Sequence, residues 1–221
     1  MTYQAWRKVH YGNLSSGPGF IVPAAGPPPS FPVNGILDNF NRANEGPPPS
    51  ASWGGIIETG NNGLRVLSNQ LVSNGAIASG YLSTTYGPDT EAYYTLGDNG
   101  DRQCLCIRLA SVGTASPTGY CVMVNVIAGA LQLFRIDGGI GSRTQLGSNV
   151  TETFSIGDKV GITVVGSTLT MYYAPVSTGV WGAVGTPQTD STLTAAGKIG
   201  LYSIDATTGN GAMDDLGGGS L

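Results

Sequence analysis

Short apolar runs separated by turn residues, with no sustained helical period, constrain the fold of this chain most. In Thr168–Tyr173, the residues Leu169, Met171 and Tyr173 alternate with side chains that suit a solvated surface, the period of two of a half-buried strand. Gly166-Ser167 precedes this segment, and because glycine leads the pair it predicts a type II′ turn from a preceding apolar strand. The same pattern recurs along the chain, so the sequence predicts an all-β fold.

The composition favours strands over helices. Only 11% of the residues are charged, while glycine reaches 35 residues and proline 13, so few charged side chains are present to solubilise exposed helices. Parallel sheets need crossover helices, and no segment indicates one. We therefore expect an antiparallel two-sheet sandwich of roughly a dozen strands, in which Ser68-Asn69 forms one of the tight hairpins.

Charge excludes several classes of partner. The formal net charge is −4, and lysine and arginine form no run, so the chain lacks the clustered cations that bind nucleic acid or an anionic membrane surface. No apolar run is long enough for membrane insertion. The N-terminus has no apolar region typical of a signal peptide. We expect a protein made in a host cytoplasm that is kept there, or that leaves by assembly or lysis.

The three cysteines indicate packing rather than chemistry. Cys104 and Cys106 are two residues apart on one expected strand, so they share a face and cannot easily bridge each other. Cys121 lies on the next expected strand. An odd number of cysteines in a reducing compartment favours buried free thiols over a disulfide.

The N-terminal region, residues 1–35, differs from the rest of the chain. It opens with contact-prone side chains, among them Trp6, Arg7 and Tyr11, and continues with a proline- and glycine-rich stretch that cannot form a ladder. We interpret residues 1–35 as an extended arm that anchors to a neighbouring protein through Trp6, Arg7 and Tyr11, with a disordered tail as the alternative. Residues 36–221 are the expected sandwich domain, and Gly217–Gly219 at its end suggests a tail or linker.

Four short motifs, the last of them in two parts, and a tryptophan follow one another in a fixed order. They are Leu37–Asn44, Trp53, Leu64–Val72, Gly157–Leu169, Gly197–Leu201 and Met213–Leu216. Together they resemble concanavalin A-like (laminin G-like) jelly-roll domains of bacterial and bacteriophage proteins, over residues 36–216. The resemblance implies an antiparallel two-sheet jelly-roll sandwich. Leu216 replaces the aromatic residue that usually closes the last motif.

Acidic residues near both ends of the domain form a candidate calcium site. In a jelly roll the first and last strands pair, so Asp38 and Asp214 or Asp215 are expected to converge. Carboxylates together with backbone carbonyls are the oxygen ligands that Ca²⁺ takes. The alternative is that these aspartates cap turns or pair with Arg42 or Arg65. No other cofactor is indicated.

No catalytic constellation is present in the sequence. The only histidine is His10, in the arm, so the sandwich has no base for a nucleophilic serine or cysteine. Glycosidases of this fold share an E-x-D-x-x-E strand motif, which is absent. The glutamates Glu45, Glu58, Glu91 and Glu152 are isolated. We expect no enzymatic activity.

Exposed aromatic rings are the candidate ligand-binding residues. Sugar rings stack on aromatic side chains, which jelly rolls place on sheet faces or apical loops. Trp181, in a loop-like segment, and Tyr172, on the solvated side of the preceding strand, are the candidates. Tyr93 and Tyr94 are weaker candidates, since one of two adjacent strand residues must face the core. Trp53 is expected in the core.

The leading functional hypothesis is a bacteriophage virion protein, either a minor tail protein or a capsid decoration or fibre protein. Its arm docks on capsid or tail proteins, and its jelly roll is displayed outward. There, several copies in a homo-oligomer bind host-surface glycans with avidity, or the domain simply stabilises the particle. The alternative is a carbohydrate-binding, lectin-like module of a bacterial protein. A glycoside-active enzyme is the third hypothesis.

Overall fold

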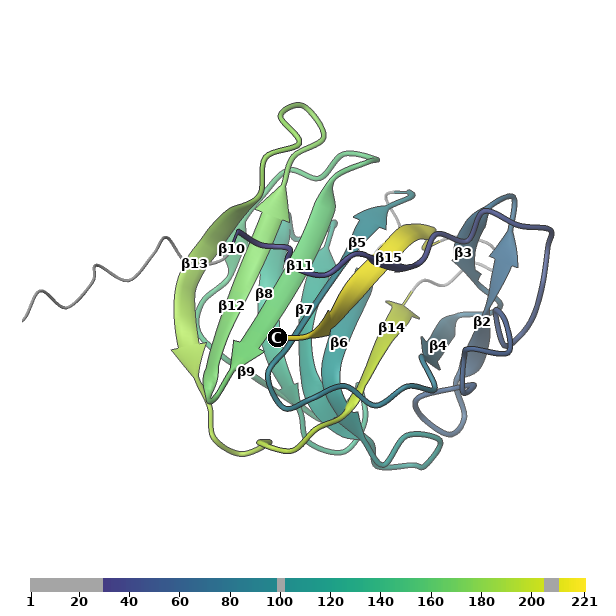
Figure 1. Cartoon of the computed structure of the whole chain (residues 1–221), viewed down its shortest axis with the longest axis horizontal. Coiled ribbons are helices and arrows are strands. Elements are labelled where there is room, and N and C mark those ends of the chain that lie inside the picture. Colours follow the sequence, from purple (N-terminus) through teal and green to yellow (C-terminus); the bar gives the residue numbers. More distant parts are fainter. Residues whose placement is uncertain (1–29, 99–101, 205–210) are drawn as a thin grey trace, which may run out of the picture. The chain divides into compact units, whose positions relative to one another are not determined.

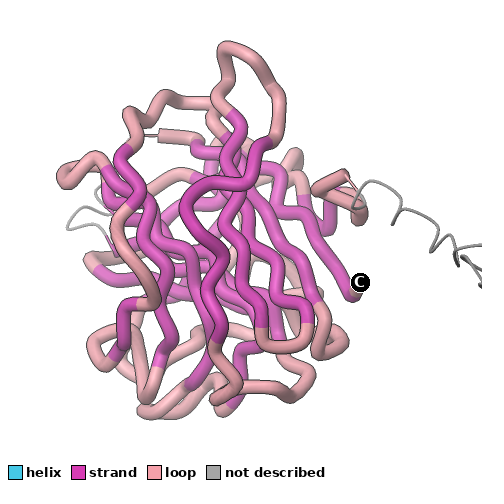
Figure 2. The backbone as a smooth tube through the Cα atoms, turned by 90° about the vertical axis from the view of Figure 1, so that its left-hand side faces the viewer, coloured by secondary structure: helices cyan, strands magenta, loops and turns pink. Residues whose placement is uncertain are grey.

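Fifteen strands and no helix make up the part of the chain that the computed structural model describes, residues 30–98, 102–204 and 211–221 (Figure 1). The all-β prediction is confirmed. Within these residues, no helix is long and apolar enough to cross a membrane. The strands run side by side between loops at both ends (Figure 2).

All but two of the described strands follow one hydrogen-bonded path, which folds into two layers. The layer nearer the viewer in Figure 1, here the front sheet, contains β1 (Ile36–Asp38), β3 (Gln70–Ser73), β5 (Thr90–Leu96), β11 (Lys159–Val165), β12 (Thr168–Ala174), β13 (Gly182–Thr189) and β15 (Met213–Ser220). The back sheet contains β4 (Ile77–Tyr81), β6 (Arg102–Ala110), β7 (Thr118–Asn125), β8 (Ala130–Ile136), β9 (Arg143–Gln145), β10 (Val150–Thr151) and β14 (Lys198–Ile204). β2 (Asn62–Leu67) connects the two sheets. It pairs antiparallel with β3 and parallel with β4, the one parallel pairing among the described strands.

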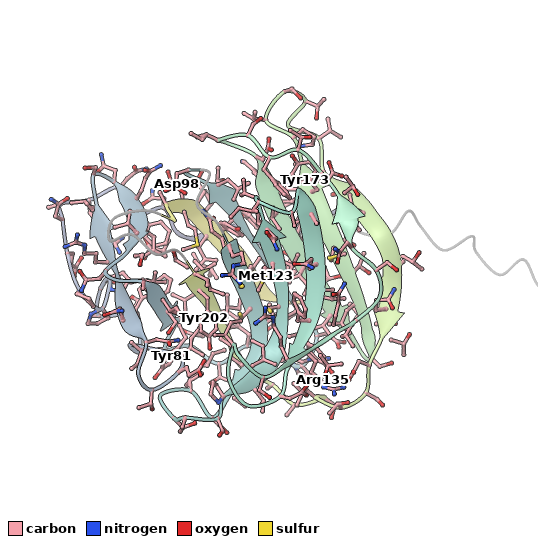
Figure 3. All side chains as sticks on the ribbon, turned by 180° about the vertical axis from the view of Figure 1, so that it is seen from behind. Tyr81, Asp98, Met123, Arg135, Tyr173 and Tyr202 are labelled. Atoms are coloured by element: carbon pink, nitrogen blue, oxygen red, sulfur yellow. The ribbon has the colours of Figure 1, made fainter. Side chains whose placement is uncertain are left out.

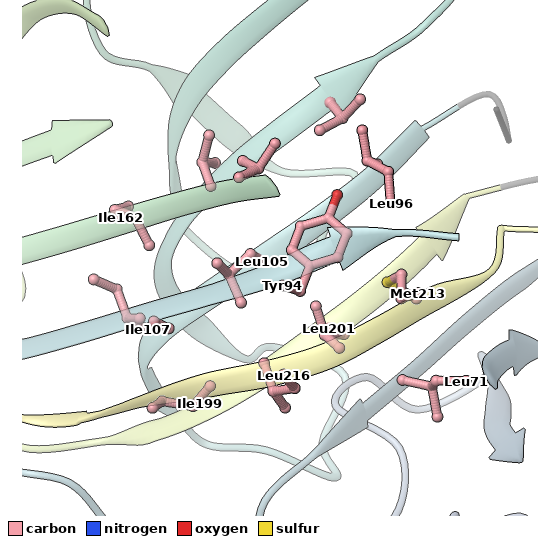
Figure 4. Close-up of a cluster of buried hydrophobic side chains, with 14 of the residues drawn as sticks. Leu71, Tyr94, Leu96, Leu105, Ile107, Ile162, Ile199, Leu201, Met213 and Leu216 are labelled. Atoms are coloured by element: carbon pink, nitrogen blue, oxygen red, sulfur yellow. The ribbon is translucent and has the colours of Figure 1, made fainter. Parts of the chain in front are cut away.

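The main core lies between the two sheets. Because side chains alternate along a strand, Tyr94, Ile162 and Leu169 point inward from the front sheet. Leu105 and Leu201 meet them from the back sheet (Figure 4). Burial of these apolar surfaces is the dominant stabilising contribution to such a sandwich.

Both predicted tight turns are confirmed. Ser68 and Asn69 have φ angles of 53° and 62°, and two positive φ values are characteristic of the type I′ turn. Gly166 has a φ of 57° and Ser167 is not among the residues with positive φ, as a type II′ turn requires. The second turn joins β11 to β12, so it fixes their register and therefore the side to which Tyr172 points.

A second apolar cluster covers the outer face of the back sheet. It contains Met123 and Tyr202, labelled in Figure 3, together with all three cysteines. Cys104, Cys106 and Cys121 are buried and free, and Cys121 pairs directly opposite Cys106. The prediction of buried free thiols is therefore confirmed.

The C-terminal glycines are strand residues, so their interpretation as a tail or linker was wrong. Gly217–Gly219 lies within β15 and pairs with β5. β15 also pairs with β1, which confirms that the first and last strands of the domain are neighbours. A Cβ atom at Gly217 would lie 2.1 Å from Cζ of Tyr93, so glycine is required there for close packing.

The compact sandwich begins at Phe31 rather than at Ile36. Residues 31–34, which we had assigned to the arm, pack on the front sheet through Phe31 and Asn34. In Figure 1 the dark purple start of the described chain crosses the face of the front sheet.

Candidate functional site

A row of outward-facing residues crosses the middle of the front sheet. Tyr93 on β5 lies opposite Gly161 on β11, and Gly161 lies opposite Tyr172 on β12. On the other side, Gly217 on β15 lies opposite Tyr93. Two aromatic rings therefore flank a position where the sheet has only bare backbone.

Trp181 joins this row from the turn between β12 and β13. It directly precedes β13, and the turn is closed by a hydrogen bond of 2.8 Å from the backbone N–H of Gly179 to the carbonyl of Pro175. Gly179 has a φ of 63°, a left-handed conformation that glycine adopts without strain. The ring centroids of Trp181 and Tyr93 are 5.8 Å apart, with 70° between the planes. We call Tyr93, Gly161, Tyr172 and Trp181 the aromatic platform.

The ring of Phe31 lies on the aromatic platform. It stacks on Tyr172, with 4.0 Å between ring centroids and 7° between the planes. Its contacts with Trp181 (4.9 Å, 84°) and Tyr93 (6.2 Å, 78°) are edge-on. These are the two favourable geometries for aromatic pairs.

Gly161 allows this close approach. A Cβ atom at this position would lie 2.3 Å from Cζ of Phe31, closer than non-bonded carbon atoms approach. The other residues of β11 all carry side chains. Gly161 is therefore the one position on β11 where a flat ring can lie directly on the backbone.

Glu91 holds the backbone that follows Phe31. Its side chain is on the same outward face as Tyr93, two residues along β5, yet Glu91 is only 1% exposed. Its two oxygens accept hydrogen bonds from the backbone N–H of Val33, at 2.8 and 3.1 Å. Oε1 also accepts hydrogen bonds from the backbone N–H and from Nδ2 of Asn34. We call Phe31–Asn34 the docking segment.

Tyr93 connects the docking segment to the platform. Its hydroxyl donates a hydrogen bond of 3.2 Å to the carbonyl of Asn34. Burial raises the pKa of Tyr93, and the negative charges of Glu91 and Asp215 raise it further. The phenol therefore stays protonated and remains a donor at neutral pH.

The structure places both predicted ligand-binding residues in this site, where Tyr172 and Trp181 both contact Phe31. Of the weaker candidates, Tyr93 faces outward and Tyr94 is in the core. The sequence reasoning missed Phe31, which it counted with the arm, and Glu91, which it counted as an isolated glutamate. The single glycine in the apolar run of β11 was a usable signal of a close approach.

The predicted calcium ligand Asp38 pairs with Arg42, which is the alternative that the sequence also allowed. Arg42 binds both carboxylate oxygens, at 2.6 and 3.0 Å. Trp53 Nε1 and the backbone N–H of Phe40 donate to the same carboxylate, at 2.9 Å each. Four donors leave little room for a cation, and the described residues contain no group of three metal-ligating side chains.

Asp214, the second predicted calcium ligand, lies near Asp38 without sharing its hydrogen bonds. Burial raises the pKa of Asp214; the backbone N–H of Asp215 lowers it, and the charges of Asp215 and Asp38 raise it again. The charge of Asp38 acts on Asp214, so the two carboxylates lie close together, as expected for the paired first and last strands.

The predicted anchoring residues Trp6, Arg7 and Tyr11 lie outside the described residues.

The described glutamates include three whose carboxylates already have partners. Glu58 accepts a hydrogen bond of 2.8 Å from the backbone N–H of Ile140. Glu45 pairs with Arg42 at 3.1 Å, and Glu91 holds the docking segment. Each carboxylate therefore has a structural contact in this arrangement.

Comparison with known proteins identifies the fold. No protein-family model and no curated protein matches the sequence. Among solved structures, the Ca²⁺/Man2-bound exoplasmic/lumenal domain of VIP36 matches with a TM-score of 0.57 at 10% identity, over 84% of this chain and 87% of that chain. The chain has a concanavalin A-like jelly-roll fold.

Two further neighbours share this fold. The carbohydrate-binding module CBM66 from Bacillus subtilis matches with a TM-score of 0.53 at 12% identity, over 76% of this chain and 92% of that chain. The CBM2 module of the evolved Dit protein of Lactobacillus casei BL23 phage J-1 matches with a TM-score of 0.52 at 11% identity. The match covers 84% of this chain and 94% of that chain. At these identities the likeness concerns the fold.

Proposed function

We propose that this chain is a non-enzymatic carbohydrate-binding module that stacks a sugar ring on its aromatic platform. The observation that carries the proposal is the parallel contact of Phe31 with Tyr172, at 4.0 Å and 7°. It means that the face of Tyr172 can accept a flat ring, with Trp181 at the ring's edge. The C–H face of a pyranose presents a similar apolar plane to an aromatic side chain.

Polar groups beside the platform suit a ligand with hydroxyl groups. The carboxylate of Glu91 lies two residues from Tyr93 on the same face, covered by the docking segment, whose backbone N–H groups donate to it. If the docking segment leaves, the same carboxylate can accept sugar hydroxyls. Aromatic rings combined with a few polar groups are typical of small-molecule sites.

The fold neighbours support a sugar as the ligand. CBM66 is named a carbohydrate-binding module, and the VIP36 domain was solved with mannose ligands. The proposal assigns no cation to Asp38 and Asp214, because Arg42 and Trp53 occupy the Asp38 carboxylate.

A glycan array tests this function. The full chain, biotinylated and assembled on streptavidin so that avidity reveals weak sites, is expected to bind a defined set of glycans. Trp181→Ala and Tyr172→Ala should each lose at least about 90% of that signal, since each removes a stacking surface. Val180→Ala is the matched control, because Val180 is adjacent to Trp181 and 68% exposed. Binding that survives both aromatic substitutions, or no binding by any form, would refute the proposal.

A second candidate places the module on a phage particle, where the outward-facing sandwich captures host glycans. The similarity to a CBM2 module of a phage Dit protein supports this setting. Deletion of residues 1–30, which lie outside the compact sandwich, should abolish incorporation into particles and leave the sandwich folded. Incorporation of the shortened chain, measured by mass spectrometry of purified virions, would contradict it.

A further inference from the structure

Apart from Phe31, the docking segment and the residues after it bury little apolar surface on the front sheet. Val33, Ile36 and Leu37 are 56%, 54% and 39% exposed, so their side chains add little burial. β1 contributes only two register pairs with β15, with an irregularity between them. The attachment consists of the Phe31 ring, the hydrogen bonds to Glu91 and Tyr93, and two hydrogen bonds to β15, from Asn34 Nδ2 to the carbonyl of Ser220 and from the N–H of Gly218 to the carbonyl of Gly35, at 3.2 Å each. A segment held mainly by hydrogen bonds, with one partly buried ring, opens at a lower free energy than the core strands.

The strand residues of the aromatic platform do not depend on the docking segment for their geometry. Tyr93, Gly161 and Tyr172 lie on three strands that pair continuously, with six registered pairs between β5 and β11 and seven between β11 and β12. The inward neighbours of these residues belong to the main core. The platform should therefore stay in place when Phe31 leaves it.

We infer that Phe31 is a removable self-ligand of the aromatic platform, which must leave Tyr172 before another ring can stack there. The inference rests on the proposed function and adds its regulation. Phe31 stacks on Tyr172 over Gly161, so a sugar stacked on the same face and Phe31 exclude each other. The chain then alternates between a closed form, with Phe31 docked, and an open form that binds the ligand.

This competition has two thermodynamic consequences. The apparent affinity for the ligand is lowered by the fraction of chains that are open. By linkage, ligand binding drives the docking segment off the sheet, and any partner that draws the segment away raises the affinity for the ligand. Binding of the sugar is therefore coupled to release of the docking segment from the sheet.

Substitution of Phe31 tests the competition directly. For a glycan identified by the array, the full-length Phe31→Ala chain should bind at least about tenfold more tightly than the wild type by calorimetry, because the closed form loses its ring contact. Val33→Ala is the matched control, since it alters an exposed side chain in the same segment and leaves the backbone N–H that bonds to Glu91. Equal or weaker binding by Phe31→Ala would overturn the inference.

A probe that needs no sugar separates this inference from the proposed function. In a Trp6→Phe background the fluorescent tryptophans are Trp53, which is 3% exposed, and Trp181. Acrylamide quenching should therefore report on Trp181, and it should increase in the Phe31→Ala chain. The synthetic peptide Ser-Phe-Pro-Val-Asn-Gly, the sequence of residues 30–35, should reverse that increase at millimolar concentration and should not affect the chain that retains Phe31.

The outcomes are distinguishable. If no form binds any glycan but the peptide protects Trp181 in Phe31→Ala, the carbohydrate proposal fails and the self-ligand stands. If Phe31→Ala leaves quenching unchanged, or the peptide gives no protection, the self-ligand fails whatever the array shows. A far-ultraviolet circular dichroism spectrum like that of the wild type confirms that each variant is folded.

Discussion

The buried carboxylate of Glu91 accepts hydrogen bonds from the backbone N–H of Val33 through both of its oxygens, at 2.8 and 3.1 Å. Position 33 and position 91 belong to segments that are far apart in sequence. This contact joins the start of the compact sandwich to the centre of its front sheet. It satisfies backbone N–H groups that belong to no strand.

Glu91→Gln should loosen the docking segment. Glutamine keeps one carbonyl oxygen but presents an amide N–H₂ to backbone donors, so the variant loses a charge-assisted contact worth about 1.5–3 kcal/mol. We expect faster hydrogen exchange at the amides of Val33 and Asn34 and a reduction of about 1–2 kcal/mol in the free energy of unfolding in urea. Glu45→Gln is the control, because its partly exposed ion pair with Arg42 contributes less than about 1 kcal/mol. Unchanged exchange at both amides would show that Glu91 does not hold the segment.

Gly161→Ala should expel the Phe31 ring without altering Phe31 itself. The added Cβ would lie 2.3 Å from Cζ of Phe31 and 3.2 Å from the carbonyl oxygen of Ala92. The loss of the stacked contact should lower the free energy of unfolding by about 1 kcal/mol, measured as a lower Tm. Gly182→Ala on β13 is the matched control, since no atom lies within 4 Å of its Cβ position. A Tm equal to that of the wild type for Gly161→Ala would contradict the packing described for this site.

Local pattern was enough to predict the all-β class and the two tight hairpins of this chain. The alternation in Thr168–Tyr173 and the glycine of Gly166-Ser167 act over neighbouring residues, so they specify a hairpin before any tertiary contact forms. The same alternation placed Tyr172 on the outward face. What the alternation does not specify is what lies over that face.

The missed parts of the site depend on contacts between distant segments. Phe31 reaches Tyr172 only because Gly161, on a strand between two others, leaves the backbone bare. Composition alone assigned Phe31 to a proline-rich arm and Gly217–Gly219 to a tail, although the latter pairs with β5. Likewise, the spacing of Asp38 and Arg42 permitted either a metal ligand or an ion pair, and the fold selected the ion pair.

Removal of one hydroxyl should have opposite effects at two tyrosines of the core. Tyr94 is fully buried beside Leu105 and Leu201 (Figure 4), and its hydroxyl has no hydrogen-bond partner among the described residues. A buried donor without a partner costs about 1–3 kcal/mol. We therefore expect Tyr94→Phe to raise the free energy of unfolding by up to about 1 kcal/mol.

Tyr173→Phe is the matched comparison. The hydroxyl of Tyr173 donates to Oδ2 of Asp158, which is only 2% exposed, and lies 3.3 Å from the carbonyl of Thr153. Its loss leaves a buried carboxylate with one donor fewer, so Tyr173→Phe should lower the free energy of unfolding by about 1–2 kcal/mol. Chemical denaturation of both variants checks the difference, and a change of the same sign in both would refute it.

The carboxylate of Asp190 should control stability in acid. It accepts hydrogen bonds from the backbone N–H of Thr192 at 2.7 Å, from Tyr120 at 2.8 Å and from Arg135 at 2.6 Å. Burial by itself would raise the pKa of Asp190, but these hydrogen bonds outweigh burial and hold the pKa at about 2, below its ordinary value of 3.8. The folded state therefore favours the charged form. This stabilisation is fully present above about pH 4 and is lost as the pH falls through about 2.

Asp190→Asn should remove that pH dependence. We expect its free energy of unfolding to be about 1–2 kcal/mol below that of the wild type at pH 7, with the difference shrinking as the pH falls from 4 to 2. Asp137→Asn is the control, since Asp137 pairs with the same Arg135 but its side chain is 32% exposed, against 8% for Asp190. Its effect should be smaller, because solvent screens exposed ion pairs. Urea titrations at several pH values measure both variants, and a constant difference between wild type and Asp190→Asn down to pH 2 would show that this carboxylate is not held in its charged form by the fold.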